Sequence, residues 1–169
     1  MKAAALIMMT LALTLAACGR DGSSYMNAKG AQRPEPVPEE KDADWRLYGQ
    51  TPEFETKVSW ASIGHKDRFG PPEYVYVWVW RKFAKDQEPP KGREYRNEFT
   101  RFALDCAKGS MASIAIERQD HEGERVKRSD VPGYQWEFDA VAKQTYMQDF
   151  FDQVCKIARE KAAVEGKDG

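Results

Sequence analysis

The sequence is poor in residues that carry acid–base or thiol chemistry near neutral pH. It has two histidines, His65 and His121, and three cysteines among 169 residues. Histidine is the side chain whose ordinary pKa lies closest to neutrality, so a histidine-based catalytic site has few candidates. A His-Glu-x-x-His pair, a Gly-x-Ser-x-Gly turn and a glycine-rich phosphate loop are also missing. These absences predict a protein that is not an enzyme and holds no cofactor or metal.

The chain also has no large excess of positive or negative charge. Lysine and arginine number 26 against 27 aspartates and glutamates, which gives a formal net charge of −1. Proteins that bind nucleic acid phosphates need clustered positive charge to do so. The balance argues against a nucleic-acid partner and against an attachment to anionic lipid by charge alone.

The sequence also has no apolar run of transmembrane length. The run at residues 3–15 has 13 residues, whereas a transmembrane helix needs about 20. Lys2 precedes it and the small residues Ala16 and Ala17 follow it. This order of positive, apolar and small residues is typical of a secretory signal peptide, here residues 1–17.

The stretch Leu15-Ala16-Ala17-Cys18 resembles a bacterial lipobox, which predicts that Cys18 is lipidated and becomes the first residue of the mature chain. The alternative is an ordinary secretory signal whose cleavage site happens to lie near a cysteine. Gly19 stands where an aspartate would favour retention at the inner membrane, so we expect anchoring in the outer membrane. Resemblance to lipoproteins implies three acyl chains, each contributing about 0.8 kcal/mol per buried CH₂. The signal is compatible with either face of that membrane.

Assigning Cys18 to lipid leaves an even pair of cysteines. In an oxidising compartment, Cys106 and Cys155 are expected to form a disulfide. The alternative makes one of them a catalytic thiolate, which requires a basic neighbour that lowers its pKa. Neither cysteine has a convincing one in the sequence.

The mature chain divides into three parts by composition. Residues 18–44 comprise the lipidated N-terminus and a segment with alternating prolines and no helical or strand period, and we expect a disordered tether. Residues 45–160 carry the periodic patterns of a folded domain. Residues 161–169 are expected to form a polar tail.

Alternating patterns of apolar residues predict that most of the domain is β-sheet. The strongest strand pattern lies at residues 71–83, where both faces are apolar, so this strand should be central. The hairpin turn at residues 120–125 contains Gly123, which tolerates tight-turn backbone angles. The other expected strands cover residues 44–49, 53–60, 94–106, 110–118 and, as a strand that closes the sheet, 134–138.

One face of the central strand carries a row of four aromatic residues, Tyr74, Tyr76, Trp78 and Trp80, called the aromatic row below. Aromatic residues are enriched at binding hot spots, so an exposed row could bind a partner. The preferred interpretation is that the row belongs to the core and is covered by the C-terminal helix.

The apolar period changes to three and four residues after Tyr146, which predicts an amphipathic helix. Thr145 precedes it and Gln148 follows three residues later, a capping-box pattern that satisfies free backbone donors. Strands followed by one amphipathic helix predict an α+β domain, with the helix packed on one face of an antiparallel sheet.

Charged clusters offer two weaker candidates. Asp120, His121 and Glu122 could hold a divalent cation, but adjacent residues in a turn rarely converge on one ion, so a solvated hairpin tip is preferred. The basic residues at 93–101 alternate with acidic ones, and a second basic stretch lies at 125–128. Such interleaved charge is typical of a solvated surface.

The order of these elements resembles the surface-adhesin protein E family of bacterial lipoproteins. The likeness spans about 110 residues, and the chain departs from the family pattern in two places. Ser59 replaces a frequent aspartate, and Lys143 and Gln144 stand where a proline is common before the helix cap. The likeness is carried by Trp45, KVSWASI at 57–63, VYVWVW at 75–80, ALDC at 103–106, Trp136, and the helix from Thr145 to Val154-Cys155.

The resemblance implies an antiparallel sheet with one helix, a disulfide between the two matching cysteines, outer-membrane attachment and binding of host matrix proteins such as vitronectin and laminin. We therefore expect a non-enzymatic binding module. The alternative is a structural or assembly partner that faces the periplasm, and a third hypothesis is an enzyme or small-ligand carrier with an unrecognised site.

Replacing Cys18→Ala should release the protein from the membrane fraction, because the thiol that takes the lipid is lost. Fractionation of cells followed by immunoblotting measures this. Persistence of the variant in the membrane fraction would contradict the lipobox assignment.

Overall fold

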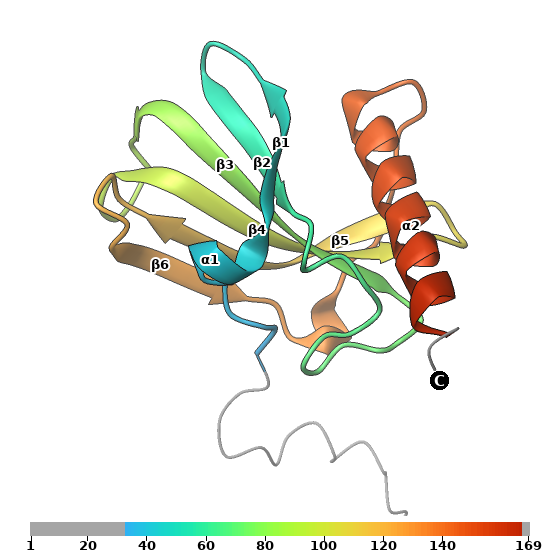
Figure 1. The fold of residues 1–169 in the computed structure, drawn as a ribbon. Coiled ribbons are helices and arrows are strands. Elements are labelled where there is room, and N and C mark those ends of the chain that lie inside the picture. The colour runs from blue at the N-terminus through green and yellow to red at the C-terminus, as the bar shows by residue number, and fades with distance from the viewer. Residues whose placement is uncertain (1–32, 167–169) are drawn as a thin grey trace, which may run out of the picture. The chain divides into compact units, whose positions relative to one another are not determined.

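The computed structural model describes residues 33–166 and shows an antiparallel seven-stranded sheet with one long C-terminal helix (Figure 1). The six main strands pair in chain order, β1-β2-β3-β4-β5-β6, and β7 pairs with β5. This is the α+β class that the sequence predicts. The predicted signal peptide at residues 1–17 and the predicted lipidation site at Cys18 lie outside the described residues. The strands are β1 Trp45–Gln50, β2 Phe54–Ser59, β3 Val75–Gln87, β4 Tyr95–Asp105, β5 Ser110–Gln119, β6 Arg125–Asp130 and β7 Asp139–Ala140; the helices are α1 Glu40–Ala43, the 3₁₀ turn η2 Gly133–Gln135, and α2 Tyr146–Glu165.

The centre of the sheet is apolar on both faces, as predicted for β3. Val75 and Val77 on one face are 2% and 0% exposed, and Tyr76 and Trp78 on the other are 0% and 1% exposed. β4 continues this pattern because Leu104 is paired opposite Val75. A sheet whose central strands are buried on both faces needs a separate cover on each side.

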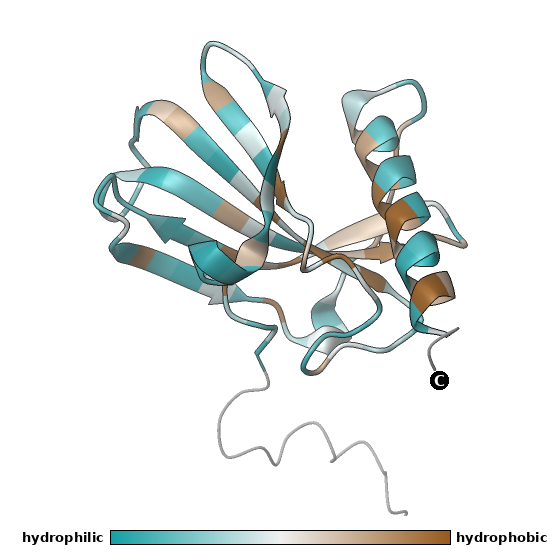
Figure 2. Ribbon diagram, viewed as in Figure 1, coloured by the Kyte–Doolittle hydropathy of each residue, from teal (hydrophilic) through white to brown (hydrophobic). Residues whose placement is uncertain are grey.

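Helix α2 covers the valine face. The side chain of Thr145 accepts a hydrogen bond from the Gln148 backbone N–H, as the capping-box pattern predicts. Phe150, Phe151 and Val154 are buried in one cluster with the valines of β3. Figure 2 shows hydrophobic residues gathering where the strands pass α2, whereas the strand ends at the turns are largely hydrophilic.

A disulfide joins α2 to the sheet. Cys106 directly follows β4 and Cys155 lies in the middle of α2, with their Cα atoms 5.9 Å apart. The pairing confirms the prediction from cysteine number and compartment. It connects residues 49 positions apart, so it restricts the unfolded chain strongly.

The aromatic face is covered by the segment of residues 33–44, called the N-terminal segment below, and not by α2. Val37 packs against the cluster that contains Trp78. Arg128 on β6 donates hydrogen bonds to the backbone carbonyls of Pro34 and Glu35 at 3.1 and 3.2 Å. The tether prediction is wrong for these residues, because their carbonyls and one apolar side chain find partners on the sheet. The folded unit therefore begins before Trp45.

The segment at 134–138 does not close the sheet, which corrects the prediction. The charged residues of β6 form that edge strand, and the chain then folds back over the aromatic face through η2. Trp136 donates its indole N–H to the carbonyl of Val131, and the side chains of Trp136 and Phe138 pack against Tyr76. Apolar alternation in this short stretch reflects a covering loop, not a strand.

The C-terminal boundary also differs from the prediction. α2 continues to Glu165, so residues 161–165 belong to the helix and not to a tail. Lys161 extends from this last part of α2 to the backbone carbonyls of Trp60 and Ile63. Among residues 33–166, no helix has the length and apolar character needed to cross a bilayer.

Replacing Cys106→Ser should lower the free energy of unfolding by about 4 kcal/mol, the chain-entropy value for a loop of this length. Urea denaturation with and without reductant measures the loss, which reductant should reproduce in the unmodified protein. Unchanged stability in the variant would show that the bond does not hold α2 in place.

Candidate functional site

The structure places the aromatic row in the core. Tyr76 and Trp78 are buried, while Tyr74 and Trp80 are partly exposed at its two ends. Trp80 donates its indole N–H to the side chain of Asn97 at 3.0 Å. With its middle beneath the N-terminal segment, the row does not present a continuous binding surface.

A buried ion pair lies beside the row. Arg101 on β4 has a side chain that is 0% exposed and contacts the 1% exposed carboxylate of Asp67 at 3.1 Å. Glu35 of the N-terminal segment adds a second carboxylate at 3.6 Å. Burial lowers the pKa of the Arg101 guanidinium, and the charges of Asp67 and Glu35 oppose that shift. The expectation that Arg101 belongs to a solvated surface is wrong, because both covering segments bring an acid to it.

The loop at residues 60–73 packs closely over Tyr76 because of a hydrogen bond at Pro71 and the missing side chain at Gly70. The hydroxyl of Tyr76 donates to the carbonyl of Pro71 at 2.7 Å. A Cβ atom at Gly70 would lie 2.2 Å from that hydroxyl, so only glycine fits there without displacement. The loop therefore carries Asp67 to Arg101 in a fixed position.

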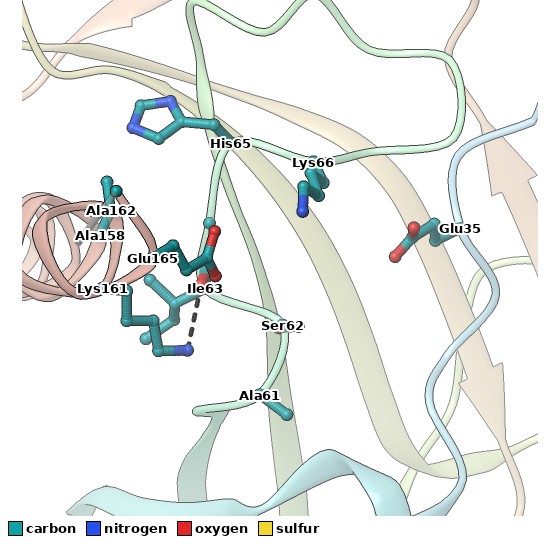
Figure 3. Close-up of a pocket in the computed structure, with 12 residues that line it drawn as sticks. Glu35, Ala61, Ser62, Ile63, His65, Lys66, Ala158, Lys161, Ala162 and Glu165 are labelled. Atoms are coloured by element: carbon teal, nitrogen blue, oxygen red, sulfur yellow. Dashed lines mark hydrogen bonds between the residues drawn. The ribbon is translucent and has the colours of Figure 1, made fainter. Parts of the chain in front are cut away.

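A cleft lies between this loop and the C-terminal half of α2 (Figure 3). Its volume is about 620 Å³, and its lining runs from Ala61 to Lys66, along α2 from Ala158 to Gly166, and to Glu35. Figure 3 shows Lys161 on the α2 side of the cavity, Glu35 on the side away from α2, and Lys66 on the loop between them. Burial lowers the pKa of Lys161, and the charge of Arg46 acts in the same direction.

The two histidines lie in different surroundings. His65 borders the cleft, and its Nδ1 lies 3.0 Å from the carbonyl oxygen of Tyr74, so the loop backbone positions the ring. His121 lies on the exposed β5–β6 turn, 3.8 Å from the Glu122 carboxylate. Among residues 33–166, no group of three potential ligand side chains could hold a metal ion, including the cluster at 120–122.

A second candidate surface lies on the α2 side of the sheet, at the end of the strands away from the buried cluster. Phe54, Phe83 and Tyr95 come from β2, β3 and β4 and are each partly exposed. The centre of the Phe83 ring lies 6.0 Å from that of Phe54 and 5.8 Å from that of Tyr95. Both pairs meet edge to face, so the three rings form one continuous apolar line across the strands.

Two arginines lie on this line of rings. The Arg81 guanidinium lies 5.1 Å from the centre of Phe54, and that of Arg118 lies 4.6 Å from the centre of Tyr95. Glu98 lies between them and accepts from Arg118 at 2.9 Å and from Arg81 at 3.5 Å. Each guanidinium is thus positioned by a ring and a carboxylate.

The line continues to the start of α2. Tyr48 on β1 packs edge to face on Tyr146 with ring centres 5.0 Å apart, and Tyr146 is 55% exposed. Burial raises the pKa of Tyr146, and the nearby Thr56 hydroxyl and Arg81 guanidinium oppose this rise. The surface formed by Phe54, Phe83, Tyr95, Tyr48, Tyr146, Arg81 and Arg118 is called the aromatic–arginine surface below.

This surface is hard to predict from the sequence for a geometric reason. Its members come from five strands and a helix, and each strand contributes only one or two of them. A usable signal is present at residues 79–83, where the valine side of β3 changes to arginine and phenylalanine after Val79. That change marks where a covered face becomes an uncovered one.

Comparison of the chain with family models, with curated proteins and with solved structures found no match.

Replacing Asp67→Leu should lower the free energy of unfolding by about 3–5 kcal/mol, because Arg101 then loses its closest buried counter-charge. The double variant Asp67→Leu with Arg101→Met should recover most of that loss, since no buried charge is left without a partner. Urea denaturation of both variants measures the difference. Equal losses in the two would show that the ion pair does not join the 60–73 loop to β4.

Proposed function

We propose that this protein is a non-enzymatic binding module, held at the bacterial outer membrane by lipid on Cys18. Its macromolecular partner contacts the aromatic–arginine surface. The domain itself serves as a rigid support, because the disulfide between Cys106 and Cys155 and the ion pair at Arg101 fasten both covers to β4.

The composition and exposure of the aromatic–arginine surface carry the proposal. Tyrosine, phenylalanine and arginine are the types enriched at protein interfaces and at their energetic hot spots. Tyr146 is 55% exposed and its neighbour Met147 is 38% exposed, although both are large apolar side chains. The arginines are already positioned on rings, so their side chains would lose little conformational entropy when a partner binds.

The two faces of the outer membrane give two versions of this function. The resemblance to surface-adhesin protein E in VYVWVW at 75–80 and ALDC at 103–106 supports the outward version, in which the partner is an extracellular matrix protein. The alternative version is a structural or assembly partner facing the periplasm. The same exposed aromatic residues would serve either one.

A photoreactive benzoyl-phenylalanine at Phe83 should crosslink the protein to its partner on cells. The same residue at Phe69, which is 45% exposed in the 60–73 loop on the aromatic face of the sheet, is the matched control and should give no product. Gel shift followed by mass spectrometry of the product measures the result. Protease added to intact cells should degrade the domain if it faces outward and spare it if it faces the periplasm.

Equal crosslinking from Phe83 and Phe69 would contradict a specific surface. The absence of any crosslinked partner at Phe83, both on intact cells and in the opened envelope, would contradict the binding function itself.

A further inference from the structure

We propose that the aromatic–arginine surface recognises an acidic, extended peptide segment of its partner. This inference rests on the proposed binding function and adds the chemistry of the partner. Its basis is the charge of the surface and the way in which the two arginines are held.

The first observation is the local charge. Arg81, Arg118 and Lys127 lie on the same side of the sheet, since Arg118 pairs with Lys127 in the β5–β6 register and Arg81 with Glu98 in the β3–β4 register. Glu98, the acidic residue beside them, is 13% exposed and already bonded to both arginines. The exposed carboxylate of Asp149 lies at the other end of the surface, where it accepts a hydrogen bond from the Tyr48 hydroxyl. The accessible charge is therefore positive at the end of the surface that holds Arg81, Arg118 and Lys127, although the whole chain has a net charge of −1.

The second observation is that the arginines keep donors for a ligand. Glu98 takes the Nε of Arg118 and the Nη1 of Arg81. Among residues 33–166, the Nη1 and Nη2 atoms of Arg118 make no hydrogen bond, and neither does the Nη2 of Arg81, whereas the Nε of Arg81 is buried and out of a ligand's reach. The free pair of donors on Arg118 matches the two oxygens of a carboxylate, and Arg81 adds a single donor.

The third observation favours a peptide over a polysaccharide or a nucleic acid. Sugars and bases stack on free ring faces, but the arginines already cover Phe54 and Tyr95, and Phe83 meets both rings edge to face. Three cations are also few for a polyanion, whose binding depends on many phosphate or sulfate contacts. The ring edges between the arginines instead offer apolar contact to aliphatic side chains that alternate with carboxylates.

The segment is expected to lie extended on this surface. The three rings lie on three neighbouring strands spaced about 4.8 Å apart, so the line of rings is roughly 10 Å long. A line of this length fits a few residues of extended or polyproline-like chain, and ordering such a chain costs little on binding.

The test is fluorescence anisotropy of the purified domain with a fluorescein-labelled peptide of about 12 residues, built of Glu-Pro-Glu-Val repeats. The peptide should bind, and a Lys-for-Glu version should not. Affinity should fall with added salt, since exposed charges are screened. Arg118→Gln and Arg81→Gln should each weaken binding about tenfold, which corresponds to about 1.4 kcal/mol.

Three further variants separate recognition from folding. Arg118→Lys keeps the charge but loses the planar pair of donors, so its loss should be smaller than that of Arg118→Gln. Lys127→Glu changes an exposed residue on the edge strand and should weaken binding without lowering stability. Arg68, which lies over the exposed ring of Phe69, is the matched control, and Arg68→Gln should leave affinity unchanged.

Equal binding by the Arg81, Arg118 and Arg68 variants would overturn the inference. So would binding of heparin or of anionic phosphatidylglycerol vesicles together with no binding of the acidic peptide. Crosslinking at Phe83 distinguishes this failure from failure of the proposed function. A partner captured at Phe83 that the acidic peptide does not displace would overturn the acidic chemistry and leave the binding function standing.

Discussion

The structure depends on one constraint: the central strand pair β3–β4 is apolar on both faces and must be covered twice. β4 fastens both covers. Cys106, at its C-terminal end, bonds α2 on the valine face, and Arg101, in the middle of the strand, holds the 60–73 loop through Asp67 on the aromatic face. A covalent bond therefore secures the cover of one face, and a buried ion pair secures part of the cover of the other face. The ion pair fixes the position of the 60–73 loop on β4. Its net contribution to the free energy of unfolding is small, as is usual for buried ion pairs.

The same constraint explains where an accessible surface remains. α2 covers the valine face only as far as Val79, and beyond that point β3 presents Arg81 and Phe83. Polar and aromatic residues are stable at such a boundary because rings pack on one another while the arginine side chains lie over them and keep their charged ends in water. The aromatic–arginine surface is thus left uncovered because α2 covers only part of the length of the strands beneath it.

Much of the fold could be predicted from local pattern. The alternation at 71–83 indicated a central strand, and Thr145 and Gln148 indicated the start of α2. The even pair of cysteines indicated the disulfide between α2 and the sheet. The errors share one cause: the pattern at 134–138 and the prolines of the N-terminal segment describe local preference only. Whether such a stretch pairs, covers or remains solvated is decided by what lies opposite it, as the bonds from Arg128 to the carbonyls of Pro34 and Glu35 illustrate.

The sequence by itself determined the strand and helix periods, the partner of each domain cysteine and the two-sided burial of β3, because each of these depends on spacing along one segment. Only the tertiary structure decided which segment covers which face, that Arg101 is buried and that Phe54, Phe83 and Tyr95 meet. Those outcomes depend on strand register and on loops that bring distant residues together. A period specifies which side chains share a face, whereas contact across strands is set by the alignment of several segments at once.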